Sequence, residues 1–267
     1  MTRGGAWRCS RLALGVILLA GFATEPGGRA KGEAIAVRHA EGSLHGFLEL
    51  RDANGALLAP GELVQQTTGG LLESRMTFHF ADSSFFEEKV AFAQRGVFTM
   101  VTYHLVQRGP AFAQDIDALL ERGARTWRVT TRSRDGKEER REGSMDLPAD
   151  TYNGMVIVVA RNLARGDTQT VHVVAFTPSP RVVDLELAPE GREGVRMGQH
   201  EASTVRYVFK PRLHGLVGLV AGIAGKIPPD SHMWVAGDTV PAFVRFQGPL
   251  YSGPVWRIDL VGPRWER

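Results

Sequence analysis

The chain has 267 residues, 43% of them hydrophobic, with 32 Lys or Arg, 29 Asp or Glu and a formal net charge of +3. Residues 1–30 hold four of the arginines and one of the glutamates, so the rest of the chain carries 28 basic and 28 acidic side chains. This balance excludes the basic surface that nucleic-acid binding requires, and the length allows a substantial core.

The N-terminus has the order of a secretory signal. Arg3, Arg8 and Arg11 precede an apolar run that ends at Ala23, and small residues follow it. The run is shorter than the roughly 20 apolar residues that a membrane-spanning helix needs. We therefore expect residues 1–30 to be a cleaved signal peptide and the mature chain to be periplasmic or secreted.

Cysteine usage limits the chemistry of the mature chain. The single cysteine, Cys9, precedes the apolar run, whereas a lipoprotein signal carries its cysteine directly after that run. Once the signal is removed, the chain has no thiol for a disulfide, a metal or nucleophilic catalysis. With no repeat or low-complexity linker, residues 31–267 are expected to form a single β-rich domain.

Strands dominate the first part of this domain. An apolar stretch at 44–50 is followed by Asn54-Gly55, a dipeptide typical of hairpin turns. Alternating residues predict strands at 76–80 and 97–106. Alternation from Trp127 to Arg132, the turn at Asp135-Gly136 and the charged return KEERRE predict a solvated hairpin at the edge of a sheet.

Three helices are predicted from apolar residues at helical spacing. The first covers 111–122, where Phe112, Ile116, Leu119 and Leu120 share a face. The second runs from a capping Asp150 to Leu163, and the third is the apolar segment 213–225.

Short strands follow the second helix and return after the third. They are expected at 170–176, 181–187, 195–201 and 204–210, and then at 232–236, 242–248 and 255–261. Pro, Gly or charged residues separate them, which is the rhythm of an antiparallel meander.

The segment 213–225 has two interpretations. It can be a buried helix on the concave side of a curved sheet, or a mobile plug or membrane-touching lid over an apolar cavity. Gly215, Gly218, Gly222 and Gly225 lie at helical spacing and lower helix stability by about 1 kcal/mol each relative to alanine. This weakness favours the lid.

No motif predicts a catalytic, cofactor or metal site. His79, His104 and His172 fall on predicted strands and could meet in space, but scattered histidines are usually polar-face or hydrogen-bonded core residues. Asp115 and Asp117 would diverge on the predicted first helix, so a solvated helix face is favoured over an acid–base pair.

Aromatic and aliphatic residues suggest an apolar groove instead. Aromatic side chains on sheet faces are core residues by default, but an aromatic concave face also makes a ligand groove. The residues expected to line it are Phe78, Phe80, Trp127, Tyr207, Leu216, Leu219, Ile223, Trp234 and Trp256.

In layout, the chain resembles uncharacterised exported β-rich proteins related to the periplasmic lipoprotein-carrier half-barrels. The shared features are an export signal, an antiparallel meander, a mid-chain helix and a Gly-rich apolar segment before the last strands. The tail GKIPPDSHMWVAGDTVPAFVRFQGPLYSGPVWRIDLVGP also looks like a segment of bacterial proteins described only as hypothetical. The charged hairpin at 132–142 and the long tail depart from the carrier pattern.

The resemblance implies an α+β, mainly β fold: a strongly curved antiparallel half-barrel or open barrel with two or three helices on its concave side. It also implies an apolar interior able to hold acyl chains. The leading hypothesis is a periplasmic binding or carrier protein for a lipid or other apolar molecule. The alternatives are an envelope scaffold that docks a partner protein through the 213–225 helix or a sheet edge, and an enzyme whose site no motif reveals.

Overall fold

The computed structural model describes residues 33–164, 166–176, 179–197, 200–212, 228–237 and 239–262. Within these ranges the chain forms fourteen antiparallel strands and one short helix. The elements are β1 (Leu44–Arg51), β2 (Leu57–Thr68), β3 (Leu71–His79), β4 (Phe85–Arg95), β5 (Val97–Arg108), β6 (Asp115–Glu121), β7 (Thr126–Arg132), β8 (Glu138–Ser144), α1 (Val156–Arg161), β9 (Gln169–Ala175), β10 (Arg181–Met197), β11 (His200–Arg212), β12 (Ser231–Ala236), β13 (Ala242–Gly248) and β14 (Trp256–Val261).

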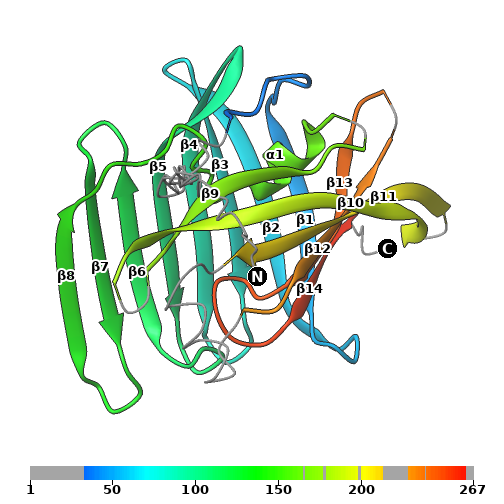
Figure 1. The fold of residues 1–267 in the computed structure, drawn as a ribbon. Helices are drawn as coiled ribbons and strands as arrows, with labels where there is room; N and C mark the ends of the chain where they lie inside the picture. The colour runs from blue at the N-terminus through cyan, green and yellow to red at the C-terminus, as the bar shows by residue number, and fades with distance from the viewer. Residues whose placement is uncertain are drawn as a thin grey trace, which may run out of the picture. The chain divides into compact units, whose positions relative to one another are not determined.

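All fourteen strands belong to one sheet in the order β8-β7-β6-β5-β4-β3-β2-β1-β14-β13-β12-β11-β10-β9. The first and last strands are therefore neighbours, and the free edges belong to β8 and β9, which follow each other in the sequence. Figure 1 shows β9 to β12 crossing in front of the row formed by β3 to β6, with α1 near the end of the crossing. The sheet curls over itself without closing into a barrel.

The curl is explained by an apolar face that most strands of the sheet turn inward. In β5, buried Tyr103 and Leu105 alternate with partly exposed Thr102 and His104, as expected for a strand with one face in the core. Tyr103 stacks on Phe176 of the crossing layer, with ring centroids 6.1 Å apart. The two layers cover each other's apolar faces. Their side chains form the main hydrophobic core of the compact unit Gly32–Arg267.

The mainly β architecture and the antiparallel meander are confirmed, as is the hairpin around Asp135-Gly136. The prediction of a helix at 111–122 is wrong, because residues 115–121 form β6. Ile116, Ala118 and Leu120 occupy every second position and are buried in the core. Apolar residues of the same stretch also fall at helical spacing, so the sequence fits both patterns.

The prediction of two or three helices is also wrong for the described residues, which contain only α1. The helix begins at Val156, and no side chain caps it, so Asp150 is not its cap. The predicted third helix, 213–225, lies outside the described residues. No described helix is long and apolar enough to cross a membrane.

The strands predicted at 181–187 and 195–201 are parts of a longer pair. Residues 181–197 form the single strand β10, and the register of its pairing with β11 shifts between Pro189 and Gly191. This irregularity marks the position where the sequence suggested a turn.

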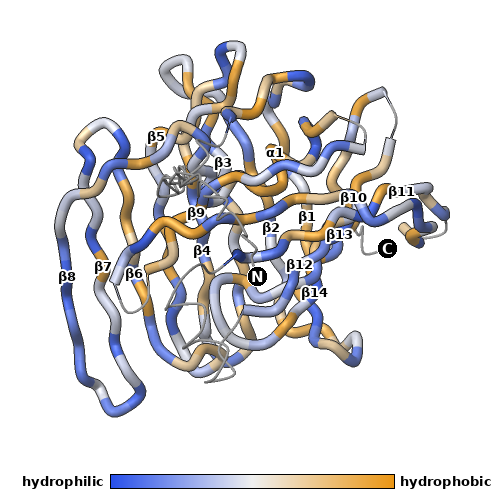
Figure 2. The backbone as a smooth tube through the Cα atoms, viewed as in Figure 1, coloured by the Kyte–Doolittle hydropathy of each residue, from blue (hydrophilic) through white to orange (hydrophobic). Residues whose placement is uncertain are grey.

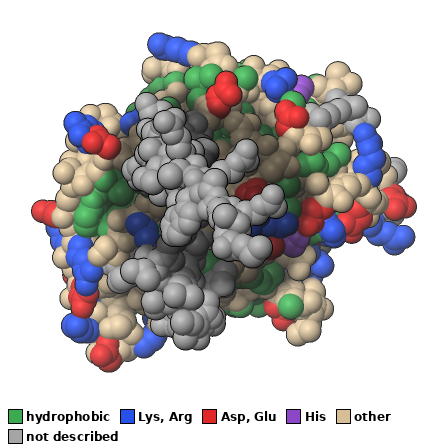
Figure 3. All heavy atoms as spheres, viewed as in Figure 1, with side chains coloured by type: hydrophobic (Ala, Val, Ile, Leu, Met, Phe, Trp, Pro, Cys, Tyr) green, Lys and Arg blue, Asp and Glu red, His purple; other side chains and the backbone are tan. Residues whose placement is uncertain are grey.

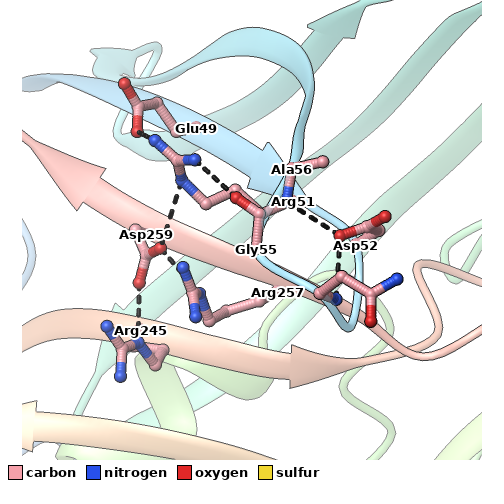
Figure 4. Close-up of polar contacts among 9 residues, drawn as sticks. Glu49, Arg51, Asp52, Gly55, Ala56, Arg245, Arg257 and Asp259 are labelled. Atoms are coloured by element: carbon pink, nitrogen blue, oxygen red, sulfur yellow. Dashed lines mark hydrogen bonds and ion pairs between the residues drawn. The ribbon is translucent and has the colours of Figure 1, made fainter.

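An ion-pair network reinforces the seam between the first and last strands. Glu49 of β1 lies opposite Asp259 of β14, and Arg245 of β13 lies on the other side of Asp259. Asp259 accepts hydrogen bonds from Nε of Arg245 at 2.6 Å and Nε of Arg257 at 2.8 Å, as Figure 4 shows. Arg51 lies beside the same carboxylate and donates to Glu49 at 2.5 Å.

The two edges of the sheet have different surroundings. Residues 148–155 run along β9: Tyr152 N donates to His172 O at 2.9 Å, and His172 N donates to Asp150 O at 3.0 Å. The Asn153 amide bonds both backbone groups of Val174, at 2.7 and 2.9 Å. In contrast, β8 is mostly exposed and hydrophilic, and Figure 2 shows it in blue along much of its length.

Candidate functional site

The candidate site lies on the inner face of the sheet, beneath α1. A cavity of about 20 Å³ is present there, and it is lined by Leu63, Gln65, Ser74, Met76, Glu88, Gly154, Ile157 and Val158. The strands supply all of its polar side chains, whereas α1 and the residue at its approach supply apolar surface. A largely apolar cavity with a few convergent polar groups is typical of a ligand site.

Strand register brings the polar groups together. Gln65 of β2 pairs with Ser74 of β3, and Glu88 of β4 lies opposite Met76, the next inward residue of β3. Gln65 Nε2 donates to Ser74 Oγ at 3.4 Å. The three side chains therefore converge because they occupy the same face of neighbouring strands.

Glu88 is the most unusual ionisable group of this face. Glu88 lies two residues after the fully buried Phe86 and two before the buried Val90. Strand alternation therefore places it on the core face of β4. Tyr103 Oη donates to Glu88 Oε1 at 2.9 Å. Burial raises the pKa of Glu88 to about 7, although the Tyr103 hydrogen bond acts in the opposite direction.

The same pair perturbs Tyr103. Burial, and then the negative charge of Glu88, raise the pKa of Tyr103 well above its ordinary value. The phenol therefore stays protonated and serves as a fixed hydrogen-bond donor to Glu88 at neutral pH. A perturbed carboxyl group that lines a cavity, with a buried hydrogen-bond partner behind it, identifies this face as the strongest candidate site of the described chain.

The helix over the cavity is intrinsically weak. It has six residues, and Val156, Ile157, Val158 and Val159 are all β-branched, a class with low helix propensity. A helix this short is not stable alone in water, so tertiary contacts must hold it in place.

Polar contacts fasten the C-terminal end of α1 to the N-terminal segment. Arg161 forms a partly buried ion pair with Glu41. Asn162 Oδ1 accepts the backbone N–H groups of Arg38 at 2.9 Å and His39 at 2.7 Å. These contacts fix one end of the helix without filling the space below it.

At the other end, Gly154 lies two residues before the helix and packs closely against the sheet. Its φ of +68° favours glycine, and a Cβ at this position would lie 3.1 Å from both Tyr103 and Val90. Backbone and packing therefore both require glycine where the chain enters α1.

The residues predicted to line a groove do not form a single group. Phe80 and Trp256 come together with Phe112, at centroid distances of 5.5 to 6.0 Å, and Phe78 lies 6.3 Å from Phe86 in the fully buried core. Figure 3 shows that hydrophobic and charged side chains both lie on the visible face.

The other predicted residues are more widely spread. Tyr207 is a core residue, and the partly buried Trp127 packs against the same core, beside Gly143 of β8. Trp234 belongs to a separate small cluster and lies opposite Arg245 of the seam network. Leu216, Leu219 and Ile223 lie outside the described residues.

A second concavity lies on the hairpin rather than in the interior. It has a volume of about 490 Å³ and is shallow. Its lining includes Leu119, Arg128 and Glu142, which face one another across β6, β7 and β8. Charged side chains line much of it, so it does not form the apolar groove expected from the sequence.

A buried charge network lies beside β9. His172 Nδ1 is 2.7 Å from Asp150 Oδ1, and His172 Nε2 is 3.5 Å from Asp184 Oδ1. The side chains of His172 and Asp150 are only 4% and 1% exposed, so this pair does not face a cleft. It holds the edge of the sheet and carries no exposed nucleophile, which does not support the enzyme hypothesis.

Arg122 fastens the same region. Its guanidinium donates to the carbonyls of Met100 at 2.7 Å, Leu147 at 3.2 Å and Pro148 at 3.1 Å. Burial lowers the pKa of this arginine. Since the donors bind main-chain carbonyls of the segment that covers β9, we assign Arg122 a structural role.

The three histidines predicted on strands do not meet. His79 contacts the ring of Phe85, His104 lies 3.1 Å from Asp117, and His172 is in the buried network. No group of three potential metal ligands is present among the described residues. Asp117 and Asp115 share a face of β6 rather than diverging, but Asp115 binds Gly109 N and Arg134.

The sequence analysis missed Glu88. The available signal was the stretch Phe85–Arg95, in which a glutamate stands in phase with Phe86 and Val90 on an alternating strand. A charged residue at a core position of a strand is uncommon, which would have marked it for attention.

No protein-family model and no curated protein matches this chain. Among solved structures, it is similar to a beta-barrel-like protein of the domain of unknown function DUF1849 from Brucella abortus. The two share 8% sequence identity at a TM-score of 0.44, over 82% of this chain and 95% of that chain.

Proposed function

We propose that this protein is a periplasmic binding or carrier protein for an apolar ligand, such as a lipid or an acyl chain, and that the ligand occupies the space filled by α1. The observation that carries the proposal is the composition of the inner face: a continuous apolar surface with one cluster of polar groups. Burial of each CH₂ group contributes about 0.8 kcal/mol, so such a surface can bind an alkyl chain without a sequence motif.

The weakness of α1 supports this function. A helix of β-branched residues without a side-chain cap has little intrinsic stability, and only its contacts favour the closed form. Binding would replace the apolar contacts of Ile157 and Val158 with those of the ligand. When the binding-competent form is a minor population of a protein, the apparent affinity for the ligand is lower than the intrinsic affinity in proportion to that population.

Detergent-free purification followed by native mass spectrometry tests the proposal directly, together with titration of an apolar fluorescent reporter. We expect a bound lipid-sized mass or saturable uptake of the reporter. A protein that is free of ligand and also fails to take up the reporter would contradict the proposed function.

A matched pair of glycine variants tests the role of α1. Gly154→Ala adds a Cβ against Tyr103 and Val90, whereas Gly166→Ala has a similar positive φ but meets nothing within 4 Å. We expect Gly154→Ala to raise the reporter affinity severalfold, because it disfavours the closed form, and Gly166→Ala to leave it nearly unchanged. Equal effects of the two variants would show that α1 is not the cover.

A further inference from the structure

The distribution of polar groups around the cavity beneath α1 indicates what part of a ligand it would hold. The polar side chains, Gln65, Ser74 and Glu88, belong to hydrogen-bonded strands of the sheet. A ligand would displace α1, whose residues Ile157 and Val158 contribute only apolar surface to the cavity. Removing α1 would therefore leave a polar floor in an apolar trough.

The hydrogen-bonding capacity of this floor suits a group that both donates and accepts. Gln65 Nε2 donates to Ser74 Oγ, so the hydroxyl proton of Ser74 is directed to another acceptor. Glu88 accepts from Tyr103 through Oε1, and its carboxylate adds further acceptor sites to the cavity. A hydroxyl group can donate to Glu88 and accept from Ser74 at the same time.

The cavity that remains with α1 in place is small. About 20 Å³ is enough for one group with a single non-hydrogen atom, such as a hydroxyl. A ligand that displaces α1 opens this space, so charge rather than size must separate a hydroxyl from a carboxylate.

We propose that Glu88, Ser74 and Gln65 form a head-group site for a ligand that carries a single neutral hydroxyl on an alkyl chain, and that the site discriminates against carboxylate head groups. The inference rests on the proposed function, since it assigns the polar end of the same ligand. The hydroxyl occupies the cavity, and the chain takes the place of α1.

Charge accounts for the discrimination. The pKa of Glu88 is about 7, so at higher pH the side chain is mainly ionised. An ionised carboxylate strengthens a hydrogen bond donated by a hydroxyl and repels a second carboxylate in the same apolar environment.

Competition between two ligands of equal chain length tests the inference. Dodecan-1-ol and dodecanoate each displace a bound apolar fluorescent reporter from the full mature chain, at a pH about one unit above 7. We expect the alcohol to compete about tenfold or more better than the carboxylate. Glu88→Gln keeps the size of the side chain and removes the charge, so it should reduce this preference to less than about threefold.

Glu87→Gln is the matched control, because Glu87 is the adjacent residue of β4 on the opposite face of the strand. It should keep the preference of the natural protein. Equal competition by the two ligands, or a preference that survives in Glu88→Gln, would overturn the head-group site while reporter binding still supports the carrier. Failure of the reporter to bind would overturn both proposals.

Discussion

The two free edges of the sheet follow each other in the sequence but are protected by different means. Along β9, residues 148–155 bind the strand through main-chain hydrogen bonds and the amide of Asn153, and His172 lies between the buried Asp150 and the partly buried Asp184. Along β8, the side chains are exposed and mostly charged. Both arrangements prevent another strand from pairing with the edge.

The difference shows how the environment of an edge determines its protection. Next to the core, an unpaired N–H or C=O group would be costly, so the chain must supply a partner for each one. In water the same groups are hydrated, and charges suffice to discourage association. The protection of β9 should therefore contribute to stability, and that of β8 mainly to solubility.

The largest expected effect comes from removing the buried imidazole of the β9 edge. His172→Ala leaves a cavity and removes the ring that the buried carboxylate of Asp150 contacts, and we expect the free energy of unfolding to fall by about 3 kcal/mol. Chemical denaturation measures this loss. His104→Ala is the control, since the His104–Asp117 pair is 34% and 48% exposed and should cost at most about 1 kcal/mol. Equal losses would show that the buried network does not stabilise the edge.

An intermediate effect is expected for Glu88 of β4, beneath α1, whose pKa shifts in the opposite direction to that of Glu139 on the β8 edge. Burial raises the pKa of Glu88 to about 7 from 4.5, whereas the hydrogen bond and charge of Lys137 lower the pKa of Glu139 on β8. Because the folded form of Glu88 binds its proton more tightly, stability falls as the pH rises from about 4.5 through 7.

Glu88→Gln should remove this decline. Its advantage over the natural protein should grow with pH and reach at most about 3 kcal/mol above pH 7, with Glu87→Gln as the control. The titratable group in contact with Glu88 is the neutral phenol of Tyr103, whose hydrogen bond lowers the pKa of Glu88 against the larger effect of burial. Denaturation over a range of pH checks the result, and parallel curves for Glu88→Gln and the natural protein would contradict it.

The smallest effect on stability is expected at β8. Arg140 and Glu142 pair with each other on the exposed strand, at 2.8 Å, and replacing both with valine should leave the unfolding midpoint nearly unchanged. The same variant should associate at lower concentration, because it removes charges that protect an open edge. Light scattering measures the association. A variant with Arg140→Lys and Glu142→Asp retains the charges and should stay dispersed; if both variants behave alike, charge does not protect β8.

Much of the fold could be predicted because most strands alternate in a simple way. The hairpin of β7 and β8 and the strand β5 follow from period-two alternation and a turn dipeptide. Strand β6 could not be recognised in the same way, since Leu119 and Leu120 are consecutive and their spacing to Phe112 and Ile116 also fits a helix.

The order of the strands and the candidate site were harder to predict. Pairing of β1 with β14 joins residues more than 200 positions apart, and local patterns carry no information about such a contact. The same limit applies to the site, because Gln65, Ser74 and Glu88 meet only through strand register. Its one local sign was Glu88 at a core position of β4.

The seam between β1 and β14 has a consequence for the order of folding events. Strands β1 to β8 can each pair with a strand that is adjacent in the sequence, but one side of β1 stays unpaired until Trp256–Val261 are in place. Until then the exposed side of β1 is a vacant template that a strand of a neighbouring copy could occupy. Docking of β14 is therefore the step that removes this opportunity for misassembly.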